Sequence, residues 1–280
     1  MKFGNYECYS VEMGRFSLDG GPMFGLVPKA LWEKKIAADN NNMIQLKTRS
    51  LLIQGEGRTI LVDTGLGNKF SEKMKKIYKI DESSTDIDSS LAKHGLTCSD
   101  ITDVIITHLH FDHTGGSTSV KNGKTVPTFP NATYYLQKEH WESAIKPNFR
   151  DAASYIKETF MPLEEYGVLK LIDGQKELFK GIDIIITQGH ALGQQHPLIK
   201  GKTNCLFFCA DLIPTSAHLP YPWNMAYDNY PLTTVSEKEK ILNRALKEKW
   251  ILFFEHDPDI AAASIKQGKK NIEIDEKINI

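Results

Sequence analysis

Short apolar runs recur along the chain, and each of them ends near a side chain that can bind a metal ion. Their residues are mostly Ile, Val, Leu and Phe, apolar at both alternating positions, which is typical of strands buried on both faces. With their polar endings, the runs are TILVDTG (59–65), DVIITHLH (103–110), IDIIITQGH (182–190), NCLFFCADL (204–212) and WILFFEHD (250–257). Strands of an α/β sheet commonly present working residues at their carboxyl ends, so we expect these endings to converge on one rim of the fold.

Helical patterns separate the strands. Amphipathic spacing and end signals predict helices within 71–80, 86–96, 137–145, 154–167 and 233–249. The tail, 262–280, alternates Ile with polar residues around a Gly-Lys-Lys turn, which predicts a closing hairpin. We see no internal repeat and no low-complexity linker. The pattern therefore predicts an α/β fold, with helices outside the strands, in a single domain over residues 1–280.

Composition and charge exclude several classes of partner. Lysine and arginine number 34 against 35 aspartates and glutamates, so the formal net charge of −1 gives no electrostatic reason to expect nucleic-acid binding. The N-terminus lacks an apolar signal segment, and no apolar stretch approaches the length of a membrane span. The four cysteines show no disulfide-type spacing. We therefore expect a cytoplasmic protein that binds neither nucleic acid nor membranes.

The densest chemistry lies in HLHFDH, residues 108–113, which holds three of the nine histidines. Alternate residues of an extended segment share a face, so His108 and His110 can bind one ion. Asp112 and His113, just past the bend, can reach a neighbouring ion. A structural zinc site would usually close with cysteine ligands, and a chance run of this composition is rare. The motif therefore indicates a catalytic metal centre.

Single polar residues at the other strand ends can complete this centre. His190 can join the first pair, His256 the second, and Asp211 is positioned to bridge both ions. Taken one at a time, each of these three is equally compatible with a capped strand end. We expect Asp63 in DTG to orient a ligand histidine or to form a turn, rather than to bind metal. Surface positions or ordinary packing are expected for the remaining histidines, His94, His140, His196 and His218.

Seven ligands of this kind suit two divalent ions about 3.5–4 Å apart. A set without a cysteine thiolate favours zinc, with manganese, cobalt or iron(II) as alternatives. Two such cations lower the pKa of a shared water, giving hydroxide at neutral pH, and polarise a carbonyl or phosphoryl oxygen. A Ser-His-Asp triad finds little support, because no Gly-x-Ser-x-Gly elbow is present. The residues thus predict a dinuclear metal-dependent hydrolase.

THLHFDHTGG (107–116), taken with LVDTG, QGHALGQ, FFCADL and FFEHDP, resembles the metallo-β-lactamase superfamily of metal-dependent hydrolases. The opening LDGGPMFGLVPKALWEKK (18–35) is similar to the branch that holds quorum-quenching N-acyl-homoserine lactonases and methyl parathion hydrolase. The resemblance implies a four-layer αβ/βα sandwich of two mixed β-sheets flanked by helices. It also implies one ion on His108, His110 and His190, a second on Asp112, His113 and His256, and a bridging Asp211.

Two positions depart from the pattern of these relatives. Gln194 stands where a second histidine is usual, which affects local packing because that histidine is generally not a ligand. Pro214 stands where some lactonases carry a tyrosine that polarises the substrate. Either Tyr221 or Tyr227 substitutes for that tyrosine, or the substrate is not a lactone.

The N-terminal segment, residues 1–45, is expected to contribute to the substrate pocket. Met23 and Phe24 are apolar, and together with Tyr221 and Tyr227 they are candidates for the wall of an acyl-binding site.

The leading hypothesis is hydrolysis of an ester or lactone, with N-acyl-homoserine lactone as a candidate substrate. A metal-bridged hydroxide attacks the carbonyl carbon, and the resemblance implies that Asp112 then protonates the leaving oxygen. Three alternatives remain: a phosphoester or phosphotriester hydrolase with the same site, a mononuclear-iron thiol dioxygenase, and a metal-stabilised binding module without activity. The expected partner is a small-molecule substrate, and pairing of two chains as a homodimer is left open.

Overall fold

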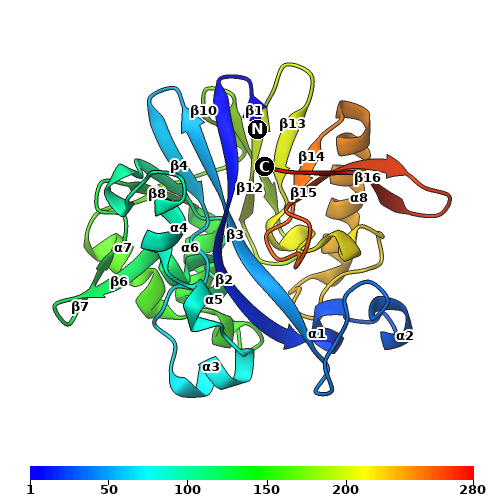
Figure 1. The fold of residues 1–280 in the computed structure, drawn as a ribbon, viewed down its shortest axis with the longest axis horizontal. Coiled ribbons are helices and arrows are strands. Elements are labelled where there is room, and N and C mark those ends of the chain that lie inside the picture. The colour runs from blue at the N-terminus through cyan, green and yellow to red at the C-terminus, as the bar shows by residue number, and fades with distance from the viewer.

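The computed structural model describes residues 1–280, which form two seven-stranded mixed sheets and a small hairpin (Figure 1). In spatial order, the first sheet contains β1 (Lys2–Phe3), β2 (Tyr6–Asp19), β3 (Met43–Gly55), β4 (Arg58–Val62), β5 (Asp103–Ile105), β8 (Thr133–Gln137) and β9 (Leu169–Ile172). The second contains β10 (Lys176–Phe179), β11 (Ile182–Thr187), β12 (Gln194–Lys200), β13 (Cys205–Phe208), β14 (Ile251–Phe253), β15 (Ala262–Gln267) and β16 (Ile272–Ile278).

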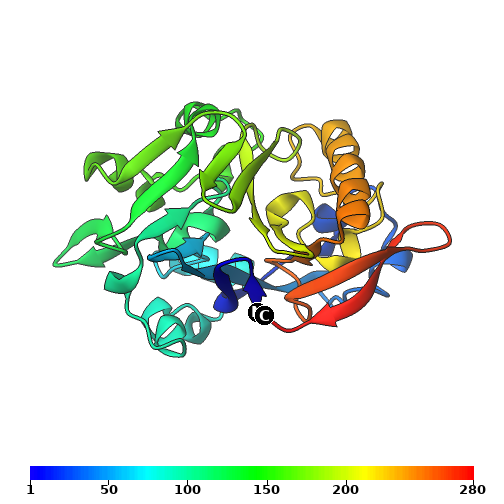
Figure 2. The same cartoon turned by 90° about the horizontal axis from the view of Figure 1, so that it is seen from above.

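Helices cover the outer face of each sheet, as Figures 1 and 2 show. The small hairpin is formed by β6 (Thr118–Lys121) and β7 (Lys124–Pro127). The helices are α1 (Gly20–Phe24), α2 (Lys29–Trp32), α3 (Glu72–Tyr78), α4 (Ile87–Ala92), α5 (Phe111–Thr114), α6 (Lys138–Ile145), α7 (Met161–Glu165) and α8 (Pro231–Glu248). Side chains of α4, α6 and α7 pack on the first sheet and those of α8 on the second. The predicted four-layer sandwich is confirmed.

Alternation along the short strands explains the layers. In β4, Ile60 and Val62 face the cluster between the two sheets, whereas Leu61 faces the helices on the outer side. In β13, Leu206 and Phe208 point inward and Phe207 points toward α8. Both faces of these strands are therefore buried, as their apolar runs predict.

The strands that carry the polar endings run in matching directions within each sheet. In the first, β4 and β5 are parallel, and Val62 lies opposite Ile105. In the second, β13 and β14 are parallel, and Phe208 lies opposite Phe253. Since both β11 and β13 are antiparallel to β12, they also share a direction. The carboxyl ends of these strands consequently reach one rim, where the predicted ligands follow.

A long antiparallel pair, β2 with β3, extends past the sheet toward α1 and α2 (Figure 1). Its pairing runs from Glu7 opposite Gln54 to Asp19 opposite Met43, with a register shift between Glu12 and Gly14. The far end of this pair brings the N-terminal segment to the rim that carries the polar endings. Beside β2, the two chain termini lie close together (Figure 2), where the Ser10 backbone N–H donates to the carbonyl oxygen of Ile280.

Two predictions about the elements have different outcomes. The closing hairpin is confirmed, with Gln267 opposite Ile272 across its turn. The helix predicted over 154–167 is wrong, because only α7 is α-helical there and Pro162 lies at its start. A proline has no backbone N–H to donate and restricts the residue before it, so it starts a helix rather than continuing one.

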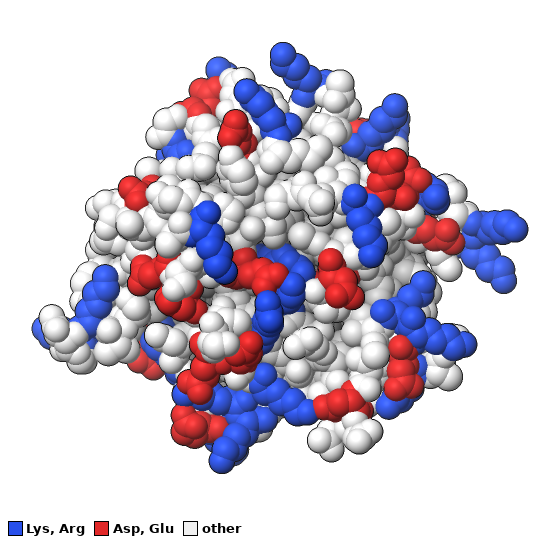
Figure 3. Space-filling model, in the orientation of Figure 1, with Lys and Arg blue, Asp and Glu red and all other residues white.

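The surface and the helices add two observations. Basic and acidic side chains are interspersed over the face drawn in Figure 3. None of the helices has the length and hydrophobicity that crossing a bilayer demands.

Candidate metal centre

The side chains of the centre come from the loops that follow five strands. His108 and His110 lie between β5 and α5, and α5 itself carries Asp112 and His113. The other ligand candidates and their neighbours follow β4 (Asp63), β11 (His190), β13 (Asp211) and β14 (His256). The structure thus brings together all seven residues that the sequence proposes as ligands, and all seven are buried.

The first group consists of three imidazoles and one carboxylate. Nδ1 of His110 lies 3.1 Å from Nε2 of His108 and 3.1 Å from Nε2 of His190. Oδ2 of Asp211 lies 3.2 Å from Nε2 of His190 and 3.8 Å from Nε2 of His108. One ligand atom of each residue lies within 4.8 Å of the others, so a single ion between them can contact all four.

The second group faces the same carboxylate from the other side. Nε2 of His113 and Nε2 of His256 are 3.2 Å apart. The Asp112 carboxylate approaches both rings, with Oδ1 3.8 Å from Nε2 of His113 and Oδ2 3.8 Å from Nε2 of His256. Oδ1 of Asp211 lies 3.1 Å from Nε2 of His256 and 3.5 Å from Nε2 of His113. Asp211 therefore presents one oxygen to each group.

Two divalent cations would satisfy the donor atoms of these residues better than hydrogen bonds among the side chains do. Oδ1 of Asp211 is buried and has no hydrogen-bond partner. In the first group, three ring nitrogens converge on one point, where hydrogen bonds among them satisfy at most part of the set. Oxygen and nitrogen donors without thiolates suit zinc, manganese, cobalt or iron(II).

The outward ring nitrogens are fixed by partners of their own. Nδ1 of His190 donates to Oδ1 of Asp228 at 2.9 Å, and Nδ1 of His256 donates to the Lys47 carbonyl oxygen at 2.8 Å. Nδ1 of His113 lies 3.0 Å from Oδ2 of Asp63 and 3.0 Å from Oε2 of Glu255. These contacts set the tautomers so that Nε2 points into the centre.

Asp63 has the orienting position expected from its place in the sequence. Its Oδ1 accepts from the Thr107 backbone N–H at 2.7 Å, and its Oδ2 accepts from the Thr107 hydroxyl at 2.6 Å as well as facing His113. Its backbone is left-handed, with φ of 55°, which Asp tolerates better than most residues. The carboxylate thus ties the end of β4 to the loop of His108.

The pKa shifts differ among the ligand histidines. Burial and neighbouring imidazoles lower the pKa of His108 and His110, so both rings are neutral and their lone pairs are available. Burial also opposes charge on His256, but the Asp211 and Glu255 carboxylates outweigh it and raise its pKa to about 9. A metal ion at the second group must displace such a proton, so its binding weakens as the pH falls.

A cavity of about 120 Å³ opens onto the centre. Of the four residues proposed for the pocket wall, Met23 and Tyr227 line it. Phe24 lies behind the wall, stacked between Trp32 and His218 at centroid distances of 5.1 and 4.6 Å. The complete lining is Phe16, Leu18, Met23, Leu46, Tyr78, His110, Phe111, Asp112, Ser154, His190, Asp211, Met225, Tyr227 and His256.

Tyr221 is not brought into this cavity. Its hydroxyl donates to Oδ1 of Asn243 on α8 at 3.0 Å, because the loop after Pro220 turns this side chain outward. The position of Pro214 is also structural, since its carbonyl oxygen accepts from the His256 backbone N–H at 3.1 Å. Tyr227 is thus the one of the two candidate tyrosines that reaches the centre.

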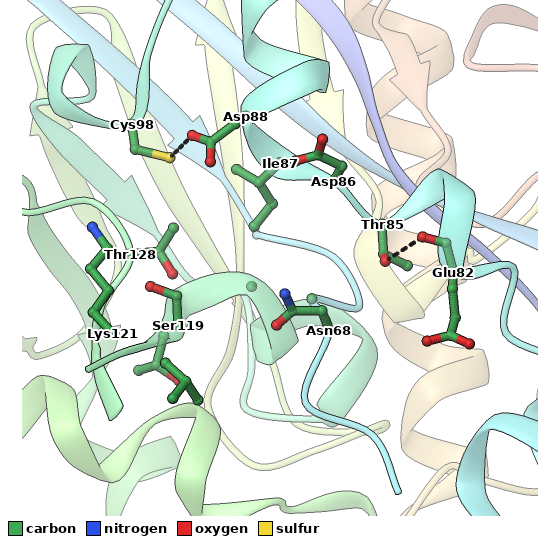
Figure 4. A pocket seen from close by; sticks show the side chains of 14 residues that line it. Asn68, Glu82, Thr85, Asp86, Ile87, Asp88, Cys98, Ser119, Lys121 and Thr128 are labelled. Atoms are coloured by element: carbon green, nitrogen blue, oxygen red, sulfur yellow. Dashed lines mark hydrogen bonds between the residues drawn. The ribbon is translucent and has the colours of Figure 1, made fainter. Parts of the chain in front are cut away.

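A larger cavity, of about 400 Å³, lies away from the proposed ligands (Figure 4). It is lined mainly by polar side chains, among them Asp86, Asp88 and Lys121, and the Cys98 thiol donates to the Asp88 carboxylate there. None of the seven ligand candidates contributes to its wall. The volume of a cavity therefore does not identify the candidate site. The convergence of buried metal-binding side chains does.

Two carboxylates at the centre were missed by the sequence reasoning. Glu255 directly precedes His256, so a search for acidic neighbours of the ligands finds it. Asp228 lies in an irregular loop without periodicity, 38 residues after His190, and no local pattern indicates their contact.

Comparison with known proteins gives the same family. A model of the metallo-β-lactamase superfamily matches residues 44–277. An N-acyl homoserine lactonase of Bacillus cereus is 28% identical over 229 residues, covering 77% of this chain and 83% of the relative. A lactonase of Bacillus thuringiensis is 28% identical over 263 residues, covering 90% and 93%.

Solved structures agree with these relatives. A probable metal-dependent hydrolase from Staphylococcus aureus matches with a TM-score of 0.90 at 32% identity, covering 99% of this chain and 100% of the other. AidC, a dizinc quorum-quenching lactonase solved with a product, has the same fold, with a TM-score of 0.83 at 22% identity and coverage of 100% and 97%. The chain therefore belongs to the metallo-β-lactamase superfamily, as a lactonase-like metal-dependent hydrolase.

Proposed function

We propose that the protein opens the lactone ring of an N-acyl-homoserine lactone, or hydrolyses a closely related ester, at a centre that holds two divalent ions. The observation that carries this proposal is the pair of buried donor groups that share Asp211 and open onto a cavity with an apolar wall. The lactonases among the relatives support the choice of substrate class.

In this proposal, His108, His110 and His190 would hold one ion, Asp112, His113 and His256 would hold the other, and Asp211 would offer one oxygen to each. Divalent ions in such a centre supply Lewis acidity, which lowers the pKa of water and polarises a carbonyl oxygen. Zinc is the first candidate, because AidC is a dizinc enzyme and the donor set suits zinc.

The cavity suits an acyl group on one side and a polar ring on the other. Phe16, Leu18, Met23 and Leu46 from the N-terminal part of the chain, with Met225, give an apolar surface against which an acyl chain is removed from water. Phe16, Leu18 and Met23 are the contribution that we assign to residues 1–45. The phenols of Tyr78 and Tyr227 line the same cavity and offer hydrogen-bond donors.

Tyr227 takes the role of the tyrosine that Pro214 replaces. Burial, together with Tyr78, Asp19 and Asp112, raises the pKa of the Tyr227 phenol, so it keeps its proton at neutral pH. A protonated phenol beside the centre can donate to the carbonyl oxygen of the substrate as negative charge develops there.

Asp112 is assigned the proton transfer. Asp112 lines the cavity, and its Oδ1 lies 3.8 Å from Nε2 of His113. A carboxylate in this position can carry a proton to the leaving oxygen after the acyl–oxygen bond breaks. Breaking the acyl–oxygen bond opens the ring to a hydroxyl and a carboxylate. The oxygen of the consumed water enters the carboxylate, one of its protons goes to the leaving oxygen through Asp112, and the other is released to solvent.

A substrate panel tests the proposal. Purified protein loaded in turn with zinc, manganese or cobalt is given N-hexanoyl-homoserine lactone and a phosphotriester, and product formation is followed for both. Faster opening of the lactone with a metal supports the proposal. Preference for the phosphotriester replaces it with the phosphotriester hydrolase.

A tyrosine pair tests the assignment of the donor. Tyr227→Phe removes the phenol from the cavity and should lower kcat/KM for the lactone about 100-fold, as expected for one lost donor to a developing oxyanion. Tyr221→Phe removes a phenol that faces Asn243 and should leave kcat/KM unchanged. Equal effects of the two substitutions would contradict the role of Tyr227.

A further inference from the structure

The first turns of α8 lie directly behind the loop that carries His190. A Cβ at Gly189 would lie 2.3 Å from the Thr234 backbone nitrogen, so loop and helix are in close contact. Asp228, which orients His190, lies just before the same helix, and Asn224 Nδ2 donates to its second oxygen at 3.1 Å. Side chains of α8 are thus placed to act on both members of the His190–Asp228 pair.

Glu237 holds the His190 side of this pair. Its Oε1 accepts from the Gln188 backbone N–H at 2.8 Å, and its Oε2 accepts from the Gly189 backbone N–H at 3.0 Å. Both N–H groups belong to the two residues that precede His190. A carboxylate with one oxygen on each of two successive N–H groups fixes the direction of the chain as it enters the ligand.

Lys238, the next residue, holds the Asp228 side. Its side chain is fully buried, and its Nζ donates to the His218 carbonyl oxygen at 3.1 Å and to the Trp223 carbonyl oxygen. These carbonyls lie on the segment that leads to Met225, Tyr227 and Asp228. A buried lysine without an ion-pair partner is costly, so its presence calls for a function that an apolar residue does not supply.

The chemistry of an amine suits this position. Burial lowers the pKa of Lys238 to about 7, with Asp228 as the neighbouring charge that opposes the shift. A neutral amine still has two N–H donors, the number of carbonyl oxygens that it binds. The contacts therefore persist in either protonation state.

We propose that Glu237 and Lys238 are a pair of positioning residues that hold His190 and Asp228 in register, one from each side of their hydrogen bond. The proposal rests on the proposed function in one respect, the role of His190 as a metal ligand. Neither residue contacts the centre; each acts through the backbone of a loop. Loss of either one should loosen the His190 ring and weaken the ion of the first group, leaving the group of His113 and His256 intact.

The test measures metal binding, with no substrate involved. Cobalt titrations followed by visible absorption give the stepwise affinities of wild type, Glu237→Ala and Lys238→Met. We expect the affinity of one of the two steps to fall 10- to 100-fold in both variants, the range seen when a partner of a ligand histidine is lost. The other step should be unchanged.

Two controls separate positioning from general loss of stability. Leu242→Ala removes a fully buried side chain one turn further along α8 and destabilises the same helix without removing a hydrogen bond to either loop. Glu239→Ala removes an exposed carboxylate beside the pair. Both should leave the two cobalt affinities at their wild-type values under conditions in which the protein is folded.

A double substitution tests the route of the effect. Asp228→Asn removes the charged partner of His190 directly and so weakens cobalt binding at the same step. Adding Glu237→Ala or Lys238→Met to it should lower that affinity by much less than the product of the separate effects. Multiplicative effects, equal losses at both cobalt steps, or a similar loss in Leu242→Ala would overturn the proposal. Failure to bind two cobalt ions in the wild type would instead contradict the dinuclear centre itself, and with it both proposals.

Discussion

Four of the five ligand histidines are held from behind by a partner that differs from residue to residue, whereas Nε2 of His110 is buried without one. The Thr107 hydroxyl serves His108. Carboxylates serve His190 and His113, and a backbone carbonyl oxygen serves His256. A charged partner increases the basicity of the ring and fixes its orientation, whereas a neutral carbonyl does mainly the latter. His113, beside Asp63 and Glu255, and His190, beside Asp228, are therefore the ligands that are sensitive to loss of a charge behind the ring.

Asp63→Asn tests this sensitivity. The amide keeps the size of the side chain and tolerates the left-handed backbone, so the fold should persist. The negative charge that faces His113 is lost, so affinity for the ion of the second group should fall 10- to 100-fold. Isothermal titration with zinc measures it, and Asp173→Asn, at an exposed position, is the control. Wild-type affinity at both steps in Asp63→Asn would contradict the orienting role.

At the scale of elements, strand ends and helices could be predicted where a local pattern repeats. The runs that end in HLHFDH, His190, Asp211 and His256 revealed both the strands and their ligands, because the pattern and the chemistry lie in the same segment. The long pair β2–β3 escaped notice, since its register depends on partners 24 to 47 residues apart and shifts between Glu12 and Gly14. Contacts of irregular loops, such as Asp228 with His190, depend on the finished fold.

The turn after α5 packs closely against the loop that follows β4. A Cβ at Gly115 would lie 1.7 Å from the Leu66 carbonyl oxygen, so Gly115→Ala forces the loop after β4 away from α5. We expect a loss of about 3 kcal/mol or more in the free energy of unfolding, and loss of the second ion, because Asp63 and His113 separate.

The control for this substitution is Gly174→Ala, at a left-handed position with φ of 71° and no atom within 4 Å of the added Cβ. It should cost about 1 kcal/mol of backbone strain and leave metal binding unchanged. Urea unfolding and metal analysis of both variants decide the matter. Equal destabilisation of the two would show that the close approach at Gly115 does not matter.

Across the whole molecule, three histidines outside the centre are buried in a neutral form. Burial lowers the pKa of each to about 4, and each has partners for both ring nitrogens: His140, His196 and His218. In the unfolded chain these rings take up protons below a pH of about 6.5, whereas the folded protein resists protonation until a pH near 4. Their contribution to the free energy of unfolding is therefore complete above a pH of about 6.5 and is lost as the pH falls toward about 4.

His196→Gln tests the sign and size of this pH dependence of stability. In chelator-treated protein, one buried neutral histidine contributes a slope of about 1.4 kcal/mol per pH unit between these two pKa values. The variant should be less stable than wild type at neutral pH, and the difference should shrink as the pH falls. Urea midpoints from pH 7 to pH 4.5 measure it. A difference that is constant with pH would contradict a neutral, proton-resisting His196.

The central claim is that two buried groups hold two ions and share one carboxylate. Metal content per chain, measured by elemental analysis after removal of loosely bound ions, tests it most directly. We expect two ions in wild type, about one in His110→Ala and in His256→Ala, and a loss from both groups in Asp211→Ala, each with the fold preserved by circular dichroism. A single ion in wild type, or full content in all three variants, would contradict it.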